Sequence, residues 1–161
     1  ASSGLGREFV RQIADVFPEI ECYWLIARRT DRLAEVAEMM PDKHVECLSM
    51  DLCDPMSFAV LAEKLATDRP EVVLLINNAG INVGPSGRAY IDGFSEEDWD
   101  HIIHTDLYGV YYCSKAAIKQ MIAQGNGGRI VNIASIVGLG EAARIKRETM
   151  EEETATFSAR K

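Results

Sequence analysis

Two glycines near the start of the chain, Gly4 and Gly6, precede a stretch whose apolar residues recur at helical spacing. Glycines let a backbone approach a phosphate group closely, and the first turn of a helix offers free N–H groups and the positive end of the helix dipole. The pair therefore predicts a site for a phosphorylated ligand. Short glycine pairs also form ordinary turns, so this pattern alone leaves both interpretations open.

Two arginines, Arg28 and Arg29, follow an apolar run that ends at Ala27. In nucleotide-binding βαβ units, an acidic residue near the end of the second strand binds the ribose hydroxyls, whereas an arginine accommodates a 2′-phosphate. No acidic residue stands at this strand end, which favours NADP(H), with NAD(H) as the alternative cofactor. The competing interpretation is a solvated basic start of a helix.

The segment from Glu71 to Gly80 joins an apolar run, Val72 to Ile76, to the sequence Asn-Asn-Ala-Gly. The run is rich in β-branched residues and too short for a typical helix, so it predicts a strand buried on both faces, as in a parallel sheet. Ligands bind at the carboxyl ends of such strands. We therefore expect the residues that follow the run to lie at a binding site.

The rest of the chain alternates helical and strand patterns, which predicts an α/β fold with a doubly wound parallel sheet of the Rossmann type. Strands are predicted over 20–27, 44–50, 72–76 and 129–134. Helices are predicted over 31–40, from Pro55, from Ser95 and from Leu107 to about Gln124. A first helix carries Phe9, Val10, Ile13, Val16 and Phe17 on its apolar face. The segment 82–93 is predicted as a loop, and 141–153 as a solvated helix or loop.

Composition indicates one globular domain, with 161 residues of which 47% are hydrophobic and 26% charged. A formal net charge of −8 disfavours a nucleic-acid partner, since phosphate backbones are bound by clustered Lys and Arg. No apolar run has the length that spans a bilayer, and no signal-peptide pattern opens the sequence, so no membrane partner is expected. Cytoplasmic localisation is the resulting expectation.

The cysteines and histidines give no pattern typical of a metal site. The four cysteines, Cys22, Cys47, Cys53 and Cys113, lack close pairing and lie in or beside apolar segments, which predicts buried thiols in a reducing compartment. His101 and His104 stand three residues apart on a predicted helix but lack a third ligand of clear spacing. No metal ligands are therefore predicted.

Four segments, in order, resemble the short-chain dehydrogenase/reductase family, over residues 1 to about 140. They are the opening Ala1–Gly6, which resembles the end of the family's glycine motif, Asp51-Leu52, Asn77–Gly80, and Gly128–Ser135 followed by Gly138. The resemblance implies hydride transfer between a nicotinamide cofactor and a small carbonyl or alcohol substrate. It assigns cofactor binding to Ser2, Ser3, Gly4, Leu5, Gly6, Arg28, Arg29, Asp51, Leu52, Asn78, Ala79, Gly80 and Lys161.

The same resemblance implies four catalytic positions, and two of them depart from the family pattern. Ser135 matches the serine that hydrogen-bonds the substrate oxygen, and Lys161 matches the lysine that holds the nicotinamide ribose. Phe157 stands where the family has a proton-transferring tyrosine, but a phenyl ring has no hydroxyl to pass a proton. Asp106 replaces an asparagine that supports a water relay, and it adds a charge. The alternative function is a catalytically impaired nucleotide-binding or dimerising module, or an inactive fragment.

The resemblance also implies that residues 1–161 form a single, incomplete NAD(P)-binding domain. In the family, the first strand lies in the middle of the sheet and the glycine motif follows it, whereas this sequence opens on the glycine motif. The strand at Val72–Ile76 is therefore expected to have an unpaired edge, and the family's C-terminal strands are expected to be absent. Family members are commonly homodimers or homotetramers, which predicts an apolar face on the helix from Leu107.

Overall fold

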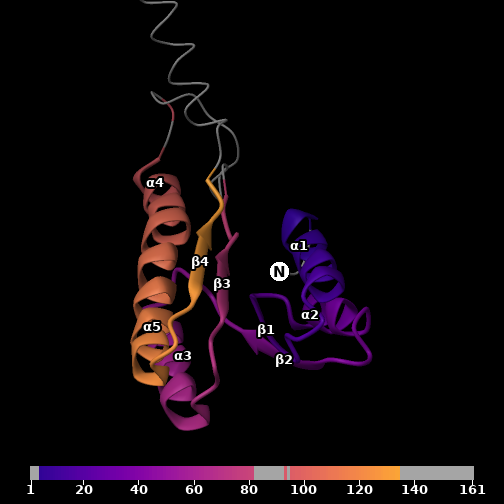
Figure 1. Ribbon diagram of the computed structural model, residues 1–161. Helices are drawn as coiled ribbons and strands as arrows, with labels where there is room; N and C mark the ends of the chain where they lie inside the picture. Colours follow the sequence, from indigo (N-terminus) through magenta and orange to yellow (C-terminus); the bar gives the residue numbers. More distant parts are fainter. Residues whose placement is uncertain (1–3, 82–92, 94, 135–161) are drawn as a thin grey trace, which may run out of the picture.

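The computed structural model describes residues 4–81, 93 and 95–134, and within them helices and strands alternate along the chain (Figure 1). The elements in order are α1 (Gly4–Val16), β1 (Cys22–Ala27), α2 (Thr30–Ala37), β2 (His44–Ser49), α3 (Pro55–Asp68), β3 (Leu74–Asn77), α4 (Glu96–Ile103), the π-helical turn η2 (His104–Tyr108), α5 (Gly109–Gln124) and β4 (Arg129–Asn132).

The four strands form two separate parallel pairs. Strand β1 pairs with β2, with Cys22 opposite His44, and β3 pairs with β4, with Leu74 opposite Arg129. Parallel pairing requires crossover connections, and helices supply them here. The predicted α/β fold with parallel strands is confirmed, and the sheet is incomplete because β1 and β3 are not paired with each other.

Helices cover both sides of the strands, as a doubly wound fold requires. Helices α1 and α2 pack on one face of β1 and β2, where Leu33 and Val36 are fully buried against Leu25. Helices α3 and α5 pack on the opposite side, with Leu61 and Cys113 in a second core. Figure 1 shows the two layers, with α3, α4 and α5 beside β3 and β4, and α1 and α2 beyond β1.

Two helices begin where side chains satisfy the free N–H groups of their first turns. Asp54 accepts a hydrogen bond from Met56 N (3.0 Å), and Pro55 occupies the first helical position of α3, where no N–H is needed. Ser95 Oγ accepts from Asp98 N (3.0 Å) at the start of α4, so the predicted helix start at Ser95 is confirmed.

Strand β3 begins at Leu74, two residues later than predicted. The backbone groups of Val72 form hydrogen bonds with a side chain instead of with a strand. Gln124 Oε1 accepts from Val72 N (2.8 Å), and Gln124 Nε2 donates to Val72 O (3.0 Å). The strand is also only partly buried, and Val73 is 41% exposed. The prediction of a strand buried on both faces is therefore wrong, because Leu74, Leu75 and Ile76 are only half-buried. Within the described residues, β3 also has a strand neighbour on one edge only.

Other predictions fail near the ends of elements and at the cysteines. Val16 and Phe17 are exposed, because α1 contacts its core through Val10, Ile13 and Ala14 and its end lies outside it. Strand β1 begins two residues later than predicted, and α2 and β4 end three and two residues earlier. Of the four cysteines only Cys113 is buried, because the strand and loop positions of the others leave one side open. Burial raises the pKa of the Cys113 thiol to about 11.

A cavity of about 290 Å³ separates β1 from the segment 72–79, and we name it the strand slot. Its lining is mostly apolar and comes from both strands together with α1, α3 and α5. Val73 O accepts a hydrogen bond from Arg129 N, and Asn77 O accepts one from Ile133 N, just after β4. Because the direction of the backbone groups alternates along a strand, Leu74 and Ile76 direct theirs to the slot. In β1, Glu21 O and Ala27 O accept hydrogen bonds from residues 44 and 50, so the odd-numbered residues face β2. Trp24 therefore directs its backbone groups to the slot.

Hydrogen exchange should report this open edge. The amides of Leu74, Ile76 and Trp24 should exchange with solvent much faster than those of Leu75 and Asn77, which face β4, because only the latter lie on a paired edge. Residue-resolved exchange by NMR measures the difference within one strand. Equal protection of neighbouring amides in β3 would show that the slot edge is closed.

Candidate functional site

The carboxyl ends of β2 and β3 meet the start of α1 at one end of the strand slot. Four predicted cofactor-binding residues line this cavity together: Gly6, Leu52, Asn78 and Ala79. Gly6 is buried in the first turn of α1, and Leu52 and Asn78 are half-buried in loops that follow strands. Residues far apart in the sequence thus share one concave surface.

Other predicted cofactor-binding residues lie near this end of the molecule but outside the cavity lining. Arg28 and Arg29 are exposed directly after β1, and Arg28 O accepts a hydrogen bond from Ser49 Oγ (3.2 Å). Asp51 follows β2 and accepts from Cys53 N (2.9 Å), which shapes the loop there. Gly4 has a left-handed backbone (φ +54°), a conformation that glycine adopts without strain. Leu5 is 65% exposed, and Gly80 follows Ala79 on the surface.

The turn η2 holds the loop that follows β3. Asp106 Oδ1 accepts a hydrogen bond from Ile81 N (2.8 Å). A Cβ atom placed on Gly80 would lie 3.7 Å from the same carboxylate oxygen, so the loop and the turn are in close contact. The predicted catalytic residue Asp106 is therefore next to the predicted cofactor loop and positions its backbone.

The same turn, with the end of α4 before it and the start of α5 after it, also holds the loop that follows β2. Cys53 Sγ lies 3.3 Å from Thr105 Oγ1 and 3.4 Å from His101 Nδ1. Leu52 packs on Gly109, where a Cβ atom would come within 3.2 Å of Leu52 Cδ1. Single π-helical turns within α-helices occur frequently at functional sites. Here the π turn connects two loops at the edge of the cavity.

A polar network at the end of β3 was not predicted from the sequence. Asn77 is buried, and its Nδ2 donates to Asn132 Oδ1 (2.8 Å) and to Ser114 Oγ (3.0 Å). These bonds join β3, β4 and α5 at the carboxyl end of the strands. The sequence shows only that Asn77 and Asn132 each end an apolar strand. It does not show that the two asparagines are partners in the strand register.

The protonation of Asp106 depends on two opposing effects. Partial burial of the carboxyl group raises its pKa, and the hydrogen bond from Ile81 N opposes the rise without cancelling it. The charged form is thus less favoured in the folded chain than in the unfolded chain. An asparagine at this position would keep an oxygen acceptor and remove the charge.

Five predicted residues lie outside the described part of the chain. They are Ser2, Ser3, Ser135, Phe157 and Lys161. The predicted loop over 82–93 lies outside it except for residue 93, and so does the charged stretch 141–153. The site described here therefore consists of the cofactor side of the predicted site and Asp106.

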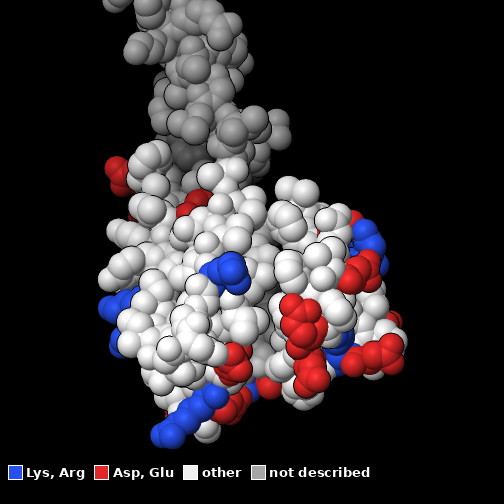
Figure 2. Space-filling view, in the orientation of Figure 1, with Lys and Arg blue, Asp and Glu red and all other residues white. Residues whose placement is uncertain are grey.

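On the face drawn in Figure 2, Lys and Arg occur as separate spots and form no continuous basic patch. Uncharged side chains cover most of the surface over α5 and β4 in that view. Among the described helices, none combines the length and the apolar character needed to cross a bilayer.

Comparison with known proteins identifies the family. The short chain dehydrogenase family model matches residues 1–146, and the chain therefore belongs to that family. A 3-oxoacyl-(acyl-carrier-protein) reductase FabG of Thermotoga maritima is 30% identical over 139 residues, which are 86% of this chain and 54% of the reductase. A 2-dehydro-3-deoxy-D-gluconate 5-dehydrogenase of Dickeya dadantii is 34% identical over 102 residues, 63% of this chain and 39% of that enzyme.

Solved structures agree with the fold. A short-chain dehydrogenase from Sphingobium yanoikuyae, determined in complex with NADPH, superimposes with a TM-score of 0.72 at 27% identity, covering 86% of this chain and 52% of that one. The chain thus spans about half the length of this neighbour, and from about two fifths to about half of the curated relatives above. The incomplete sheet follows from this partial coverage.

Substitution of Asp106 separates its hydrogen bond from its charge. Asp106→Ala should lower the free energy of unfolding by about 1 kcal/mol, the typical net value of one hydrogen bond. Asp106→Asn keeps the acceptor and should be as stable as the parent chain, or slightly more stable, at pH 7. Because the pKa of Asp106 is raised in the folded chain, the protonated carboxyl group stabilises the fold when the pH is below the pKa of the unfolded chain, near 3.8. This stabilisation is lost as the pH rises through the higher pKa of the folded chain.

Urea unfolding at pH 7 and pH 3 measures both effects. Any advantage of the asparagine variant should shrink at pH 3, where the aspartic acid is protonated in both states. If the asparagine variant loses as much stability as the alanine variant at pH 7, the carboxylate charge is required and the assignment is wrong.

Proposed function

We propose that this chain is the cofactor-binding part of an NADP(H)-dependent short-chain oxidoreductase that interconverts a carbonyl and an alcohol. The observation that carries the proposal is the single cavity lined by Gly6, Leu52, Asn78 and Ala79 in a chain of this family. Gly6 lies at the start of α1, Leu52 lies in the loop after β2, and Asn78 and Ala79 lie in the loop after β3. In a doubly wound fold, ligands bind where the carboxyl ends of the strands converge.

The preference for NADP(H) is supported by the charge at the end of β1. Arg28 and Arg29 are exposed there, and a guanidinium group can bind a 2′-phosphate through paired hydrogen bonds. The related dehydrogenase from Sphingobium yanoikuyae was determined with NADPH, in agreement with this preference. The start of α1, with its free N–H groups, is suited to the pyrophosphate.

The remaining roles are proposed residue by residue. Ser135 orients the substrate oxygen, Lys161 holds the nicotinamide ribose, and Asp106 positions the loop after β3 through Ile81 N. The nicotinamide supplies or accepts the hydride. Phe157 occupies the position of the proton donor and cannot perform that step, since its ring has no ionisable group.

The second candidate is a nucleotide-binding or dimerising module with impaired catalysis, which Phe157 favours.

Residues 1–161 are proposed to act as a single, incomplete domain whose slot takes one further parallel strand. A homodimer or homotetramer through the helix containing η2 and α5 is supported by exposed apolar residues there, namely Leu107, Tyr111, Ile118 and Ile122. The molar mass in solution tests this assembly.

Cytoplasmic localisation is proposed because all four cysteines are free thiols.

Calorimetric titration with NADPH and NADH tests the cofactor proposal. Replacing both Arg28 and Arg29 with alanine should weaken NADPH binding about ten- to hundredfold, the value of one charge-assisted hydrogen bond, and should change NADH binding by less than about threefold. Arg32→Ala is the matched control, because Arg32 is an exposed arginine of α2 that pairs with Glu35 (3.4 Å). An equal loss for both nucleotides, or no binding of either, contradicts the NADP(H) assignment.

Restoring the hydroxyl at position 157 separates the two candidate functions. Phe157→Tyr should raise NADPH-dependent reduction of small ketones and aldehydes about a hundredfold or more, because a general acid contributes that much to such reactions. Phe17→Tyr, at an exposed position in the turn that follows α1, is the control and should leave the rate unchanged. A rate that stays at zero in the presence of bound NADPH favours the non-catalytic module.

A further inference from the structure

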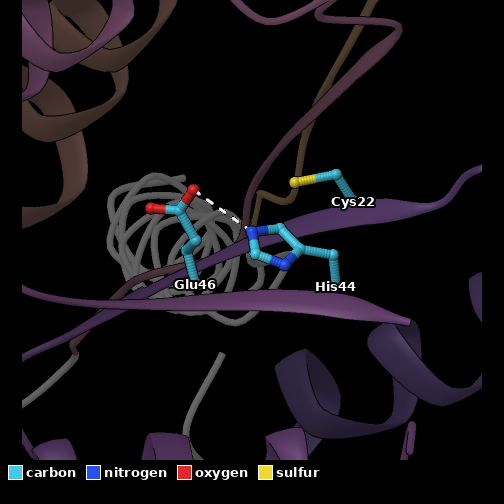
Figure 3. A group of neighbouring side chains, drawn as sticks. All are labelled: Cys22, His44 and Glu46. Carbon is cyan, nitrogen blue, oxygen red and sulfur yellow. Dashed lines mark ion pairs between the residues drawn. The ribbon is translucent and has the colours of Figure 1, made fainter. Parts of the chain in front are cut away.

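The pairing of β1 with β2 places three side chains of metal-ligating types on one face, near the amino end of β1. Cys22 also lines the strand slot, whereas the candidate nucleotide residues Leu52, Asn78 and Ala79 follow the carboxyl ends of the strands. Cys22 lies directly opposite His44 in the parallel register, and Glu46 lies two residues further along β2 on the same face. One potential ligand atom from each residue lies within 4.8 Å of the others, and Figure 3 shows the three side chains rising from the strands toward one another. We propose that Cys22, His44 and Glu46 bind a divalent transition-metal ion, with Zn²⁺ as the best-fitting ion.

The donor set determines the class of ion. A thiolate sulfur, an imidazole nitrogen and a carboxylate oxygen are the three ligand types that Zn²⁺ takes in proteins. Mg²⁺ and Ca²⁺ prefer oxygen ligands throughout, so sulfur and nitrogen donors select against them. Three protein ligands leave a fourth tetrahedral position, which water can occupy because Cys22 and His44 are exposed.

The present spacing is close to that of a zinc site. His44 Nε2 lies 3.5 Å from Glu46 Oε1. Ligand atoms of a tetrahedral Zn²⁺ site are separated by about 3.3 to 3.8 Å, given bond lengths of about 2.0 to 2.3 Å. The sulfur of Cys22 lies within 4.8 Å of the other two ligand atoms, and rotation of its side chain changes that distance while the paired strands hold the backbone.

A second layer of contacts already orients the carboxylate. Glu46 Oε2 accepts from Lys64 Nζ at 2.6 Å, and this leaves Oε1 toward His44. Lys64 is also paired with Asp68 (2.6 Å) and lies over the Trp24 ring, 4.8 Å from its centroid. Ligating carboxylates in metal sites are commonly hydrogen-bonded in this way.

The charge around the three residues can accept a dication. The positive charge of Lys64 repels a cation, but the two carboxylates that pair with it, Glu46 and Asp68, give these three residues a net charge of about −1. A thiolate at Cys22 adds a second negative charge, so a bound Zn²⁺ would balance the group. His44 has a side chain that is 69% exposed, so a metal ion can reach the site from solvent.

Metal titration of the reduced protein tests the proposal. Zn²⁺ should bind with one-to-one stoichiometry by calorimetry, and Co²⁺ should give the visible spectrum of a tetrahedral ion with a thiolate-to-metal absorption band. Cys22→Ser should abolish that band, and Cys22→Ser and His44→Gln should each weaken Zn²⁺ binding by at least about tenfold, since even the outer partners of ligands cost that much.

Cys53→Ser is the matched control, because it removes another partly exposed thiol that lies 3.4 Å from the imidazole of His101. It should change Zn²⁺ binding by less than about twofold. Circular dichroism checks that the variants stay folded. The proposal is overturned if Zn²⁺ binding does not saturate, if either ligand variant binds like the parent chain, or if Co²⁺ binds without the thiolate band.

Discussion

Side-chain hydrogen bonds hold strand β3, and the residues just before it, to helix α5. Two residues before the strand, the side-chain amide of Gln124 bonds to the backbone N–H and C=O of Val72 in place of a strand partner. At the other end, Asn77 bonds to Ser114 of α5 and to Asn132 of β4. Buried backbone and amide groups must be paired, so these contacts allow a strand with one paired edge to remain in place. The candidate site is built at the end of that strand.

The turn η2 links the two loops that form the rim of the candidate site. Asp106 bonds to the loop after β3, and Thr105 contacts the loop after β2 through Cys53. A regular α-helix would present these neighbouring side chains at a different angle, since the π turn adds one residue to the helical repeat. The two loops at the rim of the candidate site are therefore held to one helical turn by short, direct contacts.

The strand slot and the Cys22–His44–Glu46 group share Cys22, which lines the slot, but they have different physical origins. The slot results from two parallel pairs that do not join. The group results from the register of one pair, which sets residues of two strands opposite each other. A further strand in the slot would pair with backbone groups of β1, whereas the proposed metal ligands are side-chain atoms on one face of the β1–β2 pair.

The sequence by itself determined the alternation of helices and strands, the parallel fold class and the position of the loops at strand ends, because these depend on local periodicity and on residues such as Ser95 and Pro55 that begin helices. It also indicated Gly6, Leu52, Asn78 and Ala79, which the fold brings to one cavity. Only the tertiary structure decided the late start of β3 at Leu74, the π turn at Asp106 and the grouping of Cys22 with His44 and Glu46. Each of these arises from contacts between residues distant in sequence, and no local pattern encodes such contacts.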